Sequence, residues 1–316
     1  MISFIIAAYN AQNYIESCIE SCLSLKDFPS EIILVNDGST DDTPNICERL
    51  KNGYENITVI NQENKGVSAA RNVGLNKAKG DWVFFIDADD TINSVELIKV
   101  LNKLSTDWND INICTFGSNF IYKSQTEIHN VAGKSYKTKD FLNSALFQLA
   151  TWSYLFRRKF LVTNKIYFPE GIICTEDQNF NLKALCCCDK IISFNNIIYN
   201  YNCTNQNSAS KKVHSSEWIK SRLKSANDLL YFCTKHSINT DIVLNQVKRL
   251  YESYMNDNTT NISFSSKKEF YVKEYMNTVA ILPKFKKIRK LYICKISFEL
   301  GSFLFYLHRK LVSFRG

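Results

Sequence analysis

The stretch from Val83 to Asp90 has the sequence Val-Phe-Phe-Ile-Asp-Ala-Asp-Asp, and it decides the fold. Four large apolar residues in succession predict a short strand buried on both faces, as in a parallel sheet. Such a strand puts Asp87, Asp89 and Asp90 at its carboxyl end, where open α/β sheets bind ligands. Carboxylate oxygens there suit a Mg²⁺ or Mn²⁺ ion that also holds phosphate oxygens. The alternative is a polar turn whose Asp caps a helix beginning near Ser94.

The composition is that of a folded protein. Its 316 residues and 45% hydrophobic content are enough for one large domain, or two smaller ones, with a substantial core. The eleven cysteines are an odd number without a zinc-binding spacing, so we expect reduced thiols in a cytosolic protein. No basic segment precedes the apolar run Ile2–Ile6, and a secretory signal is therefore not expected.

The net charge of +8 is concentrated at the end of the chain. Residues 283–316 carry nine Lys and Arg residues against Glu299 alone, which leaves residues 1–282 formally neutral. The apolar stretch Tyr292–His308 lies between basic residues, a pattern that favours a helix at an anionic membrane surface. The alternative is a helix packed on the preceding domain. No recognition motif accompanies the charge, so a nucleic-acid partner is not expected.

Strands and helices alternate over the first ninety residues. Runs of β-branched and apolar residues predict strands, and apolar residues at a spacing of three to four predict helices. This alternation is typical of right-handed βαβ units in a parallel sheet, whose polar turns meet in one crevice. The predicted strands are 2–8, 31–35, 57–60 and 83–86, and the predicted helices are 13–25, 43–50 and 68–78.

Two kinds of phosphate chemistry fit the crevice poorly. No Gly-x-Gly-x-x-Gly follows a strand, so the fingerprint of a dinucleotide site is absent. The run Asp87–Ile92 fits the Asp-x-Asp-x-Thr pattern of haloacid-dehalogenase-like phosphatases, whose first Asp is a nucleophile. Those chains usually open with that strand, whereas here three strands precede it. This phosphatase is kept as an alternative.

Four motifs follow one another along the first ninety residues: Phe4–Asn10, Val35–Asp41, Asn64–Gly74 and Phe85–Asp90. In order and spacing they resemble the signatures of family-2 glycosyltransferases. A second group, Trp152–Arg158, Phe168–Glu170 and Thr175–Phe180, is similar to the acceptor-side half of that family. The resemblance implies an α/β protein of the GT-A fold, with a Rossmann-like mixed sheet flanked by helices and a C-terminal helical region. It also implies an inverting transferase that uses a nucleotide sugar, commonly a UDP-sugar, and Mn²⁺ or Mg²⁺.

The resemblance also implies roles for residues at the strand ends. Asp89 is the expected metal ligand, and Asp87 is expected near the donor ribose and the metal, with Ala88 between them. Asp37 is expected beside the uracil. The remaining donor-binding candidates are Ala7, Tyr9 and Asn10, which would form the wall of the nucleotide pocket, and Lys65 and Arg71 from the third motif.

Displacement at a sugar carbon needs a base for the attacking hydroxyl. Asp177 is the candidate for this base, and Glu176 is a supporting or alternative carboxylate. Neighbouring residues at the start of a helix point in different directions, so the two are not expected to share one role. The alternative is that residues 175–177 are an N-terminal helix cap with acidic residues that suit the helix dipole.

The resemblance covers about the first 215 residues. We therefore predict a catalytic domain over 1–215, with a nucleotide-sugar half (1–90) and an acceptor half (91–215). A helical region with the basic, membrane-associating tail 283–316 would occupy 216–316. Tail and family together imply an enzyme on the cytoplasmic face of the cell membrane. It would add one sugar to a glycan such as a polyprenyl-diphosphate-linked saccharide of a bacterial surface polysaccharide, a capsule or O-antigen. The alternatives are the phosphatase and a non-catalytic sugar-nucleotide binder at the membrane.

Overall fold

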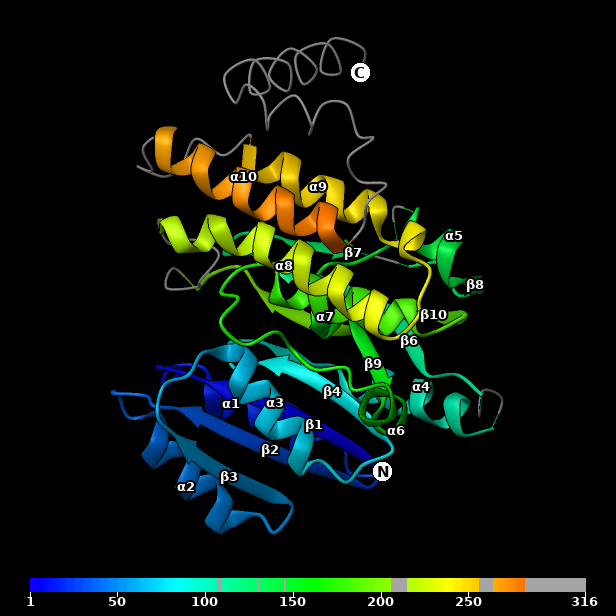
Figure 1. Cartoon of the computed structure of the whole chain (residues 1–316). Coiled ribbons are helices and arrows are strands. Elements are labelled where there is room, and N and C mark those ends of the chain that lie inside the picture. Colours follow the sequence, from blue (N-terminus) through cyan, green and yellow to red (C-terminus); the bar gives the residue numbers. More distant parts are fainter. Residues whose placement is uncertain (107–109, 130, 145, 206–214, 256–263, 282–316) are drawn as a thin grey trace. The chain divides into compact units, whose positions relative to one another are not determined.

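The computed structural model describes residues 1–106, 110–129, 131–144, 146–205, 215–255 and 264–281. The chain forms two compact units, Met1–Glu170 with Cys187–Ser208, and Gly171–Cys186 with the chain from Ala209 onward (Figure 1). The predicted division instead kept 171–186 with the acceptor half and ended that half at 215. Residues 171–186 group with the C-terminal helices because helix α7 (Glu176–Cys186) packs against α8 (Ser216–Lys235). The predicted tail 283–316 lies outside the described residues.

A ten-stranded mixed sheet is the framework of the first unit. Its main path has the order β3-β2-β1-β4-β9-β6-β10-β5, while β7 pairs with β6 and β8 pairs with β10. Strands β3, β2, β1 and β4 run parallel, and β9 joins β4 to β6 through antiparallel pairs. The strands are β1 (Ile2–Ala8), β2 (Ser30–Asp37), β3 (Ile57–Gln62), β4 (Trp82–Asp87), β5 (Thr91–Ile92), β6 (Ile113–Ile121), β7 (Thr126–His129), β8 (Ser135–Lys137), β9 (Tyr154–Arg157) and β10 (Lys190–Asn202).

The first four strands confirm the predicted parallel sheet. In β4, the side chains of residues 83–86 are at most 1% exposed, so this strand is buried on both faces as expected. In the order β3-β2-β1-β4, the carboxyl ends of β2, β1 and β4 are neighbours. The polar turns after these strands therefore lie along one edge of the sheet.

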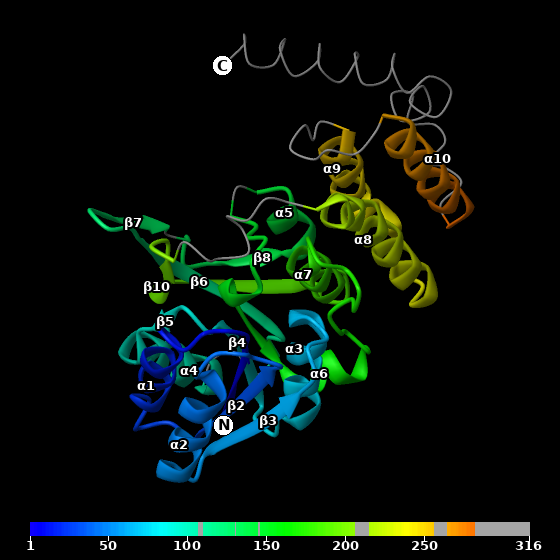
Figure 2. The ribbon, with the colours of Figure 1, turned by 90° about the vertical axis from the view of Figure 1, so that its left-hand side faces the viewer.

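Helices cover both faces of this parallel part. Figure 2 shows α1 (Ile15–Leu23) and α2 (Thr43–Gly53) on one side of β1–β3, and α3 (Val67–Lys77) on the other. Gly74 lets α3 approach β1 closely, because a Cβ at this position would lie 2.3 Å from Cγ2 of Ile5. The other helices of this unit are α4 (Ser94–Thr106), α5 (Thr138–Leu142), η1 (Thr151–Ser153) and α6 (Arg158–Thr163).

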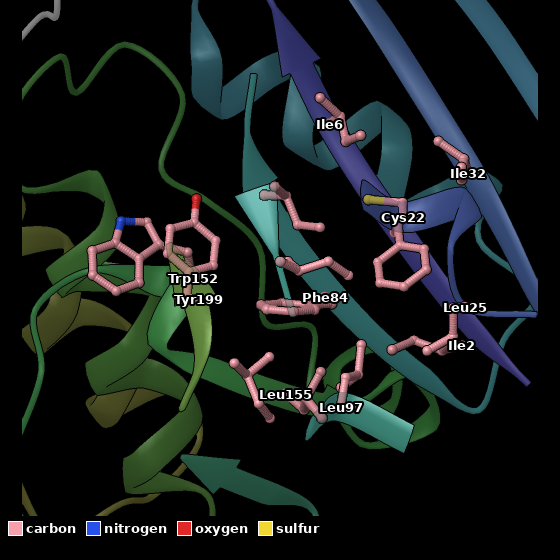
Figure 3. Close-up of a cluster of buried hydrophobic side chains, with 14 of the residues drawn as sticks. Ile2, Ile6, Cys22, Leu25, Ile32, Phe84, Leu97, Trp152, Leu155 and Tyr199 are labelled. Atoms are coloured by element: carbon pink, nitrogen blue, oxygen red, sulfur yellow. The ribbon is translucent and has the colours of Figure 1, made fainter. Parts of the chain in front are cut away.

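A hydrophobic core fills the α1 side of the sheet and extends to strand β10 (Figure 3). Phe84 in β4 lies against Phe116, with ring centroids 5.4 Å apart. Further along, the rings of Trp152 and Tyr199 stack with centroids 4.3 Å apart and an interplanar angle of 5°. Burial of one such side chain stabilises the fold by about 1.5–3 kcal/mol. This stack fixes the position of Tyr199, whose hydroxyl reaches the turn after β4.

The described cysteines agree with the expected reduced thiols. None of the ten cysteines in the described ranges forms a disulfide. Burial raises the pKa of Cys47 to about 11, and it raises the pKa of Cys114 further. These buried thiols stay protonated and act as small apolar side chains.

The second unit is helical, in agreement with the apolar spacing from residue 216 onward. Besides α7 and α8 it contains η3 (Thr240–Ile242), α9 (Leu244–Met255) and α10 (Phe264–Ile281). Polar contacts join α7 to α8: Nζ of Lys183 lies 2.5 Å from Oδ2 of Asp228, and Nδ2 of Asn179 donates to the carbonyl of Ser225 at 3.0 Å. Among the helices that the structure describes, none is long and apolar enough to cross a membrane.

Candidate functional site

Three carboxylates, here called the strand-end carboxylates, follow the buried part of β4: Asp87, Asp89 and Asp90. Asp87 is the last residue of β4 and pairs with Ala7 of β1. Asp87 and Asp89 are half-buried, whereas Asp90 is 1% exposed and Ala88 is buried in the core. The three acidic side chains, adjacent in sequence, therefore occupy different environments.

Asp90 binds the protein itself. Its Oδ2 accepts a hydrogen bond from the hydroxyl of Tyr199 at 2.6 Å, and its Oδ1 accepts one from the backbone N–H of Asn202 at 2.7 Å. The Tyr199 oxygen in turn accepts a hydrogen bond from the backbone N–H of Asp87 at 3.1 Å. Burial, together with the negative charges of Asp87 and Asp89, raises the pKa of Asp90 well above its usual range. Asp90 and Tyr199 thus anchor the turn that carries the other two carboxylates.

Asp87, in the fourth motif, forms an ion pair with Arg71, in the third. Nη2 of Arg71 lies 2.7 Å from Oδ1 of Asp87, and the Arg71 side chain is 6% exposed against 33% for Asp87. The Arg71 guanidinium also lies 5.1 Å from the ring centroid of Phe168. A buried guanidinium in contact with a carboxylate and a ring is held in one position. Arg71 is therefore placed to orient Asp87.

Asp89 faces a pocket of about 240 Å³. The pocket, here called the Asp89 pocket, lies between the start of α1 and the ends of β6 and β10. Oδ2 of Asp89 accepts a hydrogen bond from Nδ2 of Asn205 at 2.7 Å. Of the strand-end carboxylates, Asp89 is the one that lines this pocket.

Asp37, at the end of β2, is 4% exposed and organises the neighbouring loop. Its Oδ1 accepts hydrogen bonds from Nε2 of Gln62 at 2.7 Å and from the backbone N–H of Lys65 at 2.8 Å. Its Oδ2 accepts one from the backbone N–H of Gly66 at 2.9 Å. Gly66 has a φ of 87°, a conformation that favours glycine. Asp37 thus fixes the turn that carries Lys65, whose side chain is exposed.

The loop after β1 supplies an exposed aromatic ring. Tyr9 is 51% exposed and directly follows Ala8, the last residue of β1. Asn10 has a φ of 51°, and its Oδ1 accepts a hydrogen bond from the backbone N–H of Thr40 at 2.8 Å. Its own backbone N–H donates to Oγ of Ser39 at 3.0 Å. These bonds join the loops after β1 and β2, and the Tyr9 ring lies at the surface.

The donor set suits a divalent cation that is shared with a phosphate. Asp87 and Asp89 present oxygen ligands, and Mg²⁺ is commonly bound through one or two carboxylates plus substrate phosphates. Within the described ranges, no group of three or more His, Cys, Asp and Glu side chains is arranged to hold a metal ion. A cation at Asp87 and Asp89 would therefore need ligands from a substrate or water.

The helix-start pair, Glu176 and Asp177, belongs to the second unit and forms the first turn of α7. Both side chains are half-buried. Thr175, just before the helix, has a φ of 66°, a left-handed conformation that is uncommon for a β-branched residue. Its hydroxyl donates to the carbonyl of Cys174. In an ordinary Thr cap the hydroxyl instead accepts from an N–H of the first turn.

Strained backbone of this kind concentrates at functional sites. The helix behind the pair is held firmly, because Asn179 is 1% exposed and bonds to Ser225, and Lys183 pairs with Asp228. The Thr175 hydroxyl is therefore not an ordinary helix cap, which was the alternative interpretation of residues 175–177.

The structure adds residues that the sequence did not assign to the site. Tyr199 and Asn202 hold Asp90, Asn205 holds Asp89, and Gln62 holds Asp37. A partial signal exists for the first two, since Tyr199–Asn202 alternates aromatic and amide residues at the end of a strand. Trp152, the first residue of the stretch Trp152–Arg158, is buried and stacks on Tyr199.

Comparison with protein families gives a match to the model described as glycosyl transferase family 2, over residues 3–163. The chain is similar to the putative glycosyltransferase EpsH of Bacillus subtilis strain 168, at 32% identity over 191 residues, 58% of this chain and 55% of EpsH. It is also similar to the poly(ribitol-phosphate) beta-N-acetylglucosaminyltransferase TarS of Staphylococcus aureus strain Mu50, at 30% identity over 204 residues, 63% of this chain and 35% of TarS. The matched regions thus span about half the length of EpsH and a third of TarS.

A solved structure has a similar fold. The crystal structure of residues 1–349 of S. aureus TarS in complex with UDP-GlcNAc aligns with 95% of this chain and 92% of its own, with a TM-score of 0.62 and 21% identity. The mixed sheet flanked by helices is therefore the GT-A arrangement, as the motifs implied.

Proposed function

The chain belongs to glycosyl transferase family 2, and from that premise we propose that it transfers a single sugar from a UDP-sugar to a hydroxyl of a glycan acceptor, with inversion. The relatives support a role in bacterial polysaccharide or teichoic acid synthesis, since TarS glycosylates poly(ribitol-phosphate) by its name. The similar fold of TarS holds UDP-GlcNAc, which supports a UDP-sugar as the donor.

The observation that carries this proposal is the arrangement along the edge of the parallel strands. Asp87 ends β4 and Asp89 lies two residues beyond it, the exposed Tyr9 follows β1, and the buried Asp37 ends β2. This edge offers carboxylates for a cation, which would in turn hold a diphosphate, and next to them an aromatic ring on which a nucleobase could stack. Such a combination suits a nucleotide diphosphate and is the default ligand position in an open α/β sheet.

Asp87 and Asp89 are the residues that would hold Mn²⁺ or Mg²⁺. When bound, the ion would neutralise charge that develops on the departing diphosphate. Arg71 would keep Asp87 in its orientation through the 2.7 Å ion pair. Asp37 would hold the Lys65–Gly66 turn against the nucleotide through its two backbone hydrogen bonds.

The transfer step assigns a base role to Asp177. The acceptor oxygen attacks the anomeric carbon and forms the new C–O bond, while the bond from that carbon to the phosphate oxygen breaks. The electron pair of the broken bond leaves with UDP, and the hydroxyl proton goes to the Asp177 carboxylate. A single displacement of this kind inverts the anomeric centre. Glu176 would support Asp177 electrostatically.

We further propose that the acceptor is a lipid-linked glycan, reached from the cytoplasmic face of the membrane. This rests on the sequence alone, in which nine Lys and Arg residues stand against one acidic residue over 283–316. Each basic residue near an anionic surface contributes about 1 kcal/mol. The full chain should therefore co-sediment with vesicles that contain phosphatidylglycerol but not with neutral phosphatidylcholine vesicles. Equal sedimentation with both would contradict a charge-driven membrane site.

The decisive experiment combines a binding assay with a product assay on the purified chain. The melting temperature of the chain is measured with each of a panel of nucleotides and nucleotide sugars, with and without Mn²⁺. UDP and one UDP-sugar should raise it when Mn²⁺ is present, because a ligand that binds only the native state stabilises that state. Release of UDP should then require an acceptor. Release of inorganic phosphate from a phosphomonoester in the absence of any UDP-sugar would favour the phosphatase. Binding of a nucleotide sugar without any transfer would favour the sugar-nucleotide binder.

A further inference from the structure

Helices α7 and α8 lie side by side in the second unit, and their polar contacts fix how their residues line up (Figure 2). In the first half of α7, Nδ2 of Asn179 donates to the carbonyl of Ser225. One turn later, Nζ of Lys183 lies 2.5 Å from Oδ2 of Asp228 and 5.5 Å from the ring centroid of Phe232. Residue numbers thus rise together along the two helices, so the last turn of α7 faces the part of α8 around Phe232.

Two thiols meet at this place. Cys186 is the last residue of α7, and Cys233 directly follows Phe232 in α8. The Cys186 thiol donates a hydrogen bond to the sulfur of Cys233. Cys186 is half-buried, whereas Cys233 is 0% exposed. One sulfur can therefore be reached from solvent, and the other is held against it in the interior.

The surroundings of Cys233 favour its thiolate form. The hydrogen bond from Cys186 lowers the pKa of the Cys233 thiol, the positive charge of Lys183 lowers it as well, and burial opposes both. The thiolate is the form that attacks an oxidised sulfur. An accessible cysteine beside a second cysteine that can attack it is the arrangement of redox-sensing pairs.

Helix α1 contains a second thiol pair in different surroundings. Cys18 and Cys22 also lie within hydrogen-bonding distance of each other. Both side chains are 0% exposed, and the Cys18 thiol donates to the carbonyl of Asp87 at 3.6 Å. No oxidant can reach these sulfurs in the folded chain, so this pair serves as a comparison within the same molecule.

We propose that Cys186 and Cys233 form a reversible disulfide in the presence of hydrogen peroxide, and that this bond clamps the end of α7 to α8. The inference goes beyond the proposed function and does not depend on it. Disulfides in reducing compartments are usually transient and redox-sensing. A bond that forms only under oxidation agrees with the thiols that the structure shows.

The accessible thiol reacts first. The Cys186 sulfur attacks one oxygen of the peroxide, the O–O bond breaks, and the second oxygen leaves as water with the Cys186 proton. Cys186 is then a sulfenic acid. The Cys233 sulfur attacks the Cys186 sulfur, so the S–S bond forms and the S–O bond breaks. The departing hydroxide takes up the proton that the Cys233 thiol gave up and leaves as water. In total, two thiols lose two electrons to one peroxide.

The test needs no substrate. The purified full chain is treated with hydrogen peroxide, the remaining thiols are alkylated under denaturing conditions, and the non-reduced peptides are mapped by mass spectrometry. The main product should join Cys186 to Cys233, while Cys18 and Cys22 should be alkylated. The melting temperature of the oxidised chain should rise by about 3–6 °C, because the bond constrains the unfolded chain. Dithiothreitol should reverse both changes.

Two single variants provide the matched control. Cys186→Ser should show no rise in melting temperature with peroxide. Cys187→Ser changes the neighbouring cysteine, which is half-buried like Cys186, and should form the bond as the wild type does. The proposal is overturned if peroxide does not join Cys186 to Cys233, if it joins either of them to another cysteine instead, or if Cys186→Ser gains as much thermal stability as Cys187→Ser.

Discussion

The strand-end carboxylates and the helix-start pair present acidic side chains in contrasting ways. At the end of β4, each carboxylate has its own hydrogen-bond partner: Arg71 for Asp87, Asn205 for Asp89 and Tyr199 for Asp90. At the start of α7, Glu176 and Asp177 follow a left-handed Thr175 on a helix anchored by buried polar contacts. The strand end is thus fixed one side chain at a time, whereas the helix start is fixed as a rigid element.

This difference shows how adjacent acidic residues come to have separate roles. Three neighbouring carboxylates would repel one another if all faced the same space. The fold avoids this by burying Asp90, pairing Asp87 with a guanidinium and leaving Asp89 toward the pocket. In the helix-start pair, the separation follows from the helix itself, because consecutive side chains point about 100° apart. The first arrangement suits a cation and the second suits a single base.

The largest expected effect is on the helix-start pair. Asp177→Asn should lower kcat about 1,000-fold, within the range of a lost general base, because the amide cannot accept the proton of the acceptor hydroxyl. Affinity for UDP should be unchanged, because the proton is transferred in the chemical step and not when the donor binds. Steady-state kinetics and UDP titration measure the two quantities.

Two further variants control this experiment. Glu176→Gln should lose much less activity than Asp177→Asn, and Glu269→Gln, which changes an exposed carboxylate on α10, should match the wild type. Transfer by Asp177→Asn at a near wild-type rate, or a larger loss in Glu176→Gln, would remove Asp177 as the base.

The second prediction concerns Asp89, whose substitution should weaken UDP binding, whereas that of Asp177 should lower kcat and leave UDP binding unchanged. Loss of a residue that only supports a metal ligand typically weakens metal binding about 10- to 100-fold. Asp89 is itself a proposed ligand, so Asp89→Asn should weaken Mn²⁺-dependent UDP binding by at least the upper end of that range, about 100-fold. The amide oxygen can still accept the bond from Asn205, so the fold should persist. Calorimetric titration of UDP with Mn²⁺, and again with EDTA, measures the effect. Asp27→Asn, at an exposed position, is the control, and UDP binding that is insensitive to EDTA would contradict the metal role.

The sequence predicted the parallel half of the fold because each of its strands is a local pattern. Apolar runs marked β1–β4, and the helices between them followed from apolar spacing within about eleven residues. The other half depends on contacts between distant residues. Strand β9 is four residues long, yet it lies between β4 and β6 through antiparallel pairs that no local pattern encodes. The grouping of α7 with α8 was missed for the same reason.

The residues of the candidate site also fall into two groups, those predicted from local motifs and those whose role depends on contacts with distant residues. Asp37, Arg71, Asp87 and Asp89 were predicted from motifs, and the structure brings Arg71 to Asp87 over a separation of 16 residues. The inward role of Asp90 was not foreseen, because its partners Tyr199 and Asn202 are 109 and 112 residues away. The conformation of Thr175 was equally hidden, since backbone angles set by packing leave no mark on residue type.

The third prediction tests the anchoring of the strand end. Tyr199→Phe keeps the stack on Trp152 but removes the hydroxyl between Asp90 and the backbone N–H of Asp87. It should lower the free energy of unfolding by about 1–3 kcal/mol, and weaken Mn²⁺-dependent UDP binding about tenfold. Urea denaturation and UDP titration measure both. Tyr136→Phe is the control, because the buried Tyr136 hydroxyl has no partner among the described residues, and its removal should be nearly neutral. Unchanged UDP binding in Tyr199→Phe would make Tyr199 a purely structural residue.

The smallest expected effect concerns two carboxylates that flank β4, Asp81 before it and Asp90 after it. Their contributions to stability should change with pH in opposite directions. The pKa of Asp90 is raised in the folded state, so its contribution to stability is present at low pH and is lost as the pH rises through that pKa. The stability of the wild type relative to Asp90→Asn should therefore fall with rising pH above about 4, by at most about 1.4 kcal/mol per pH unit. At the other end, the amino terminus lowers the pKa of Asp81 through a hydrogen bond, so the wild type should gain stability relative to Asp81→Asn as the pH rises. That gain should be small because the Asp81 side chain is 70% exposed. Urea denaturation in EDTA at a series of pH values gives both slopes, and slopes of the same sign would mean that Asp90 is not the buried carboxylate that holds the strand end.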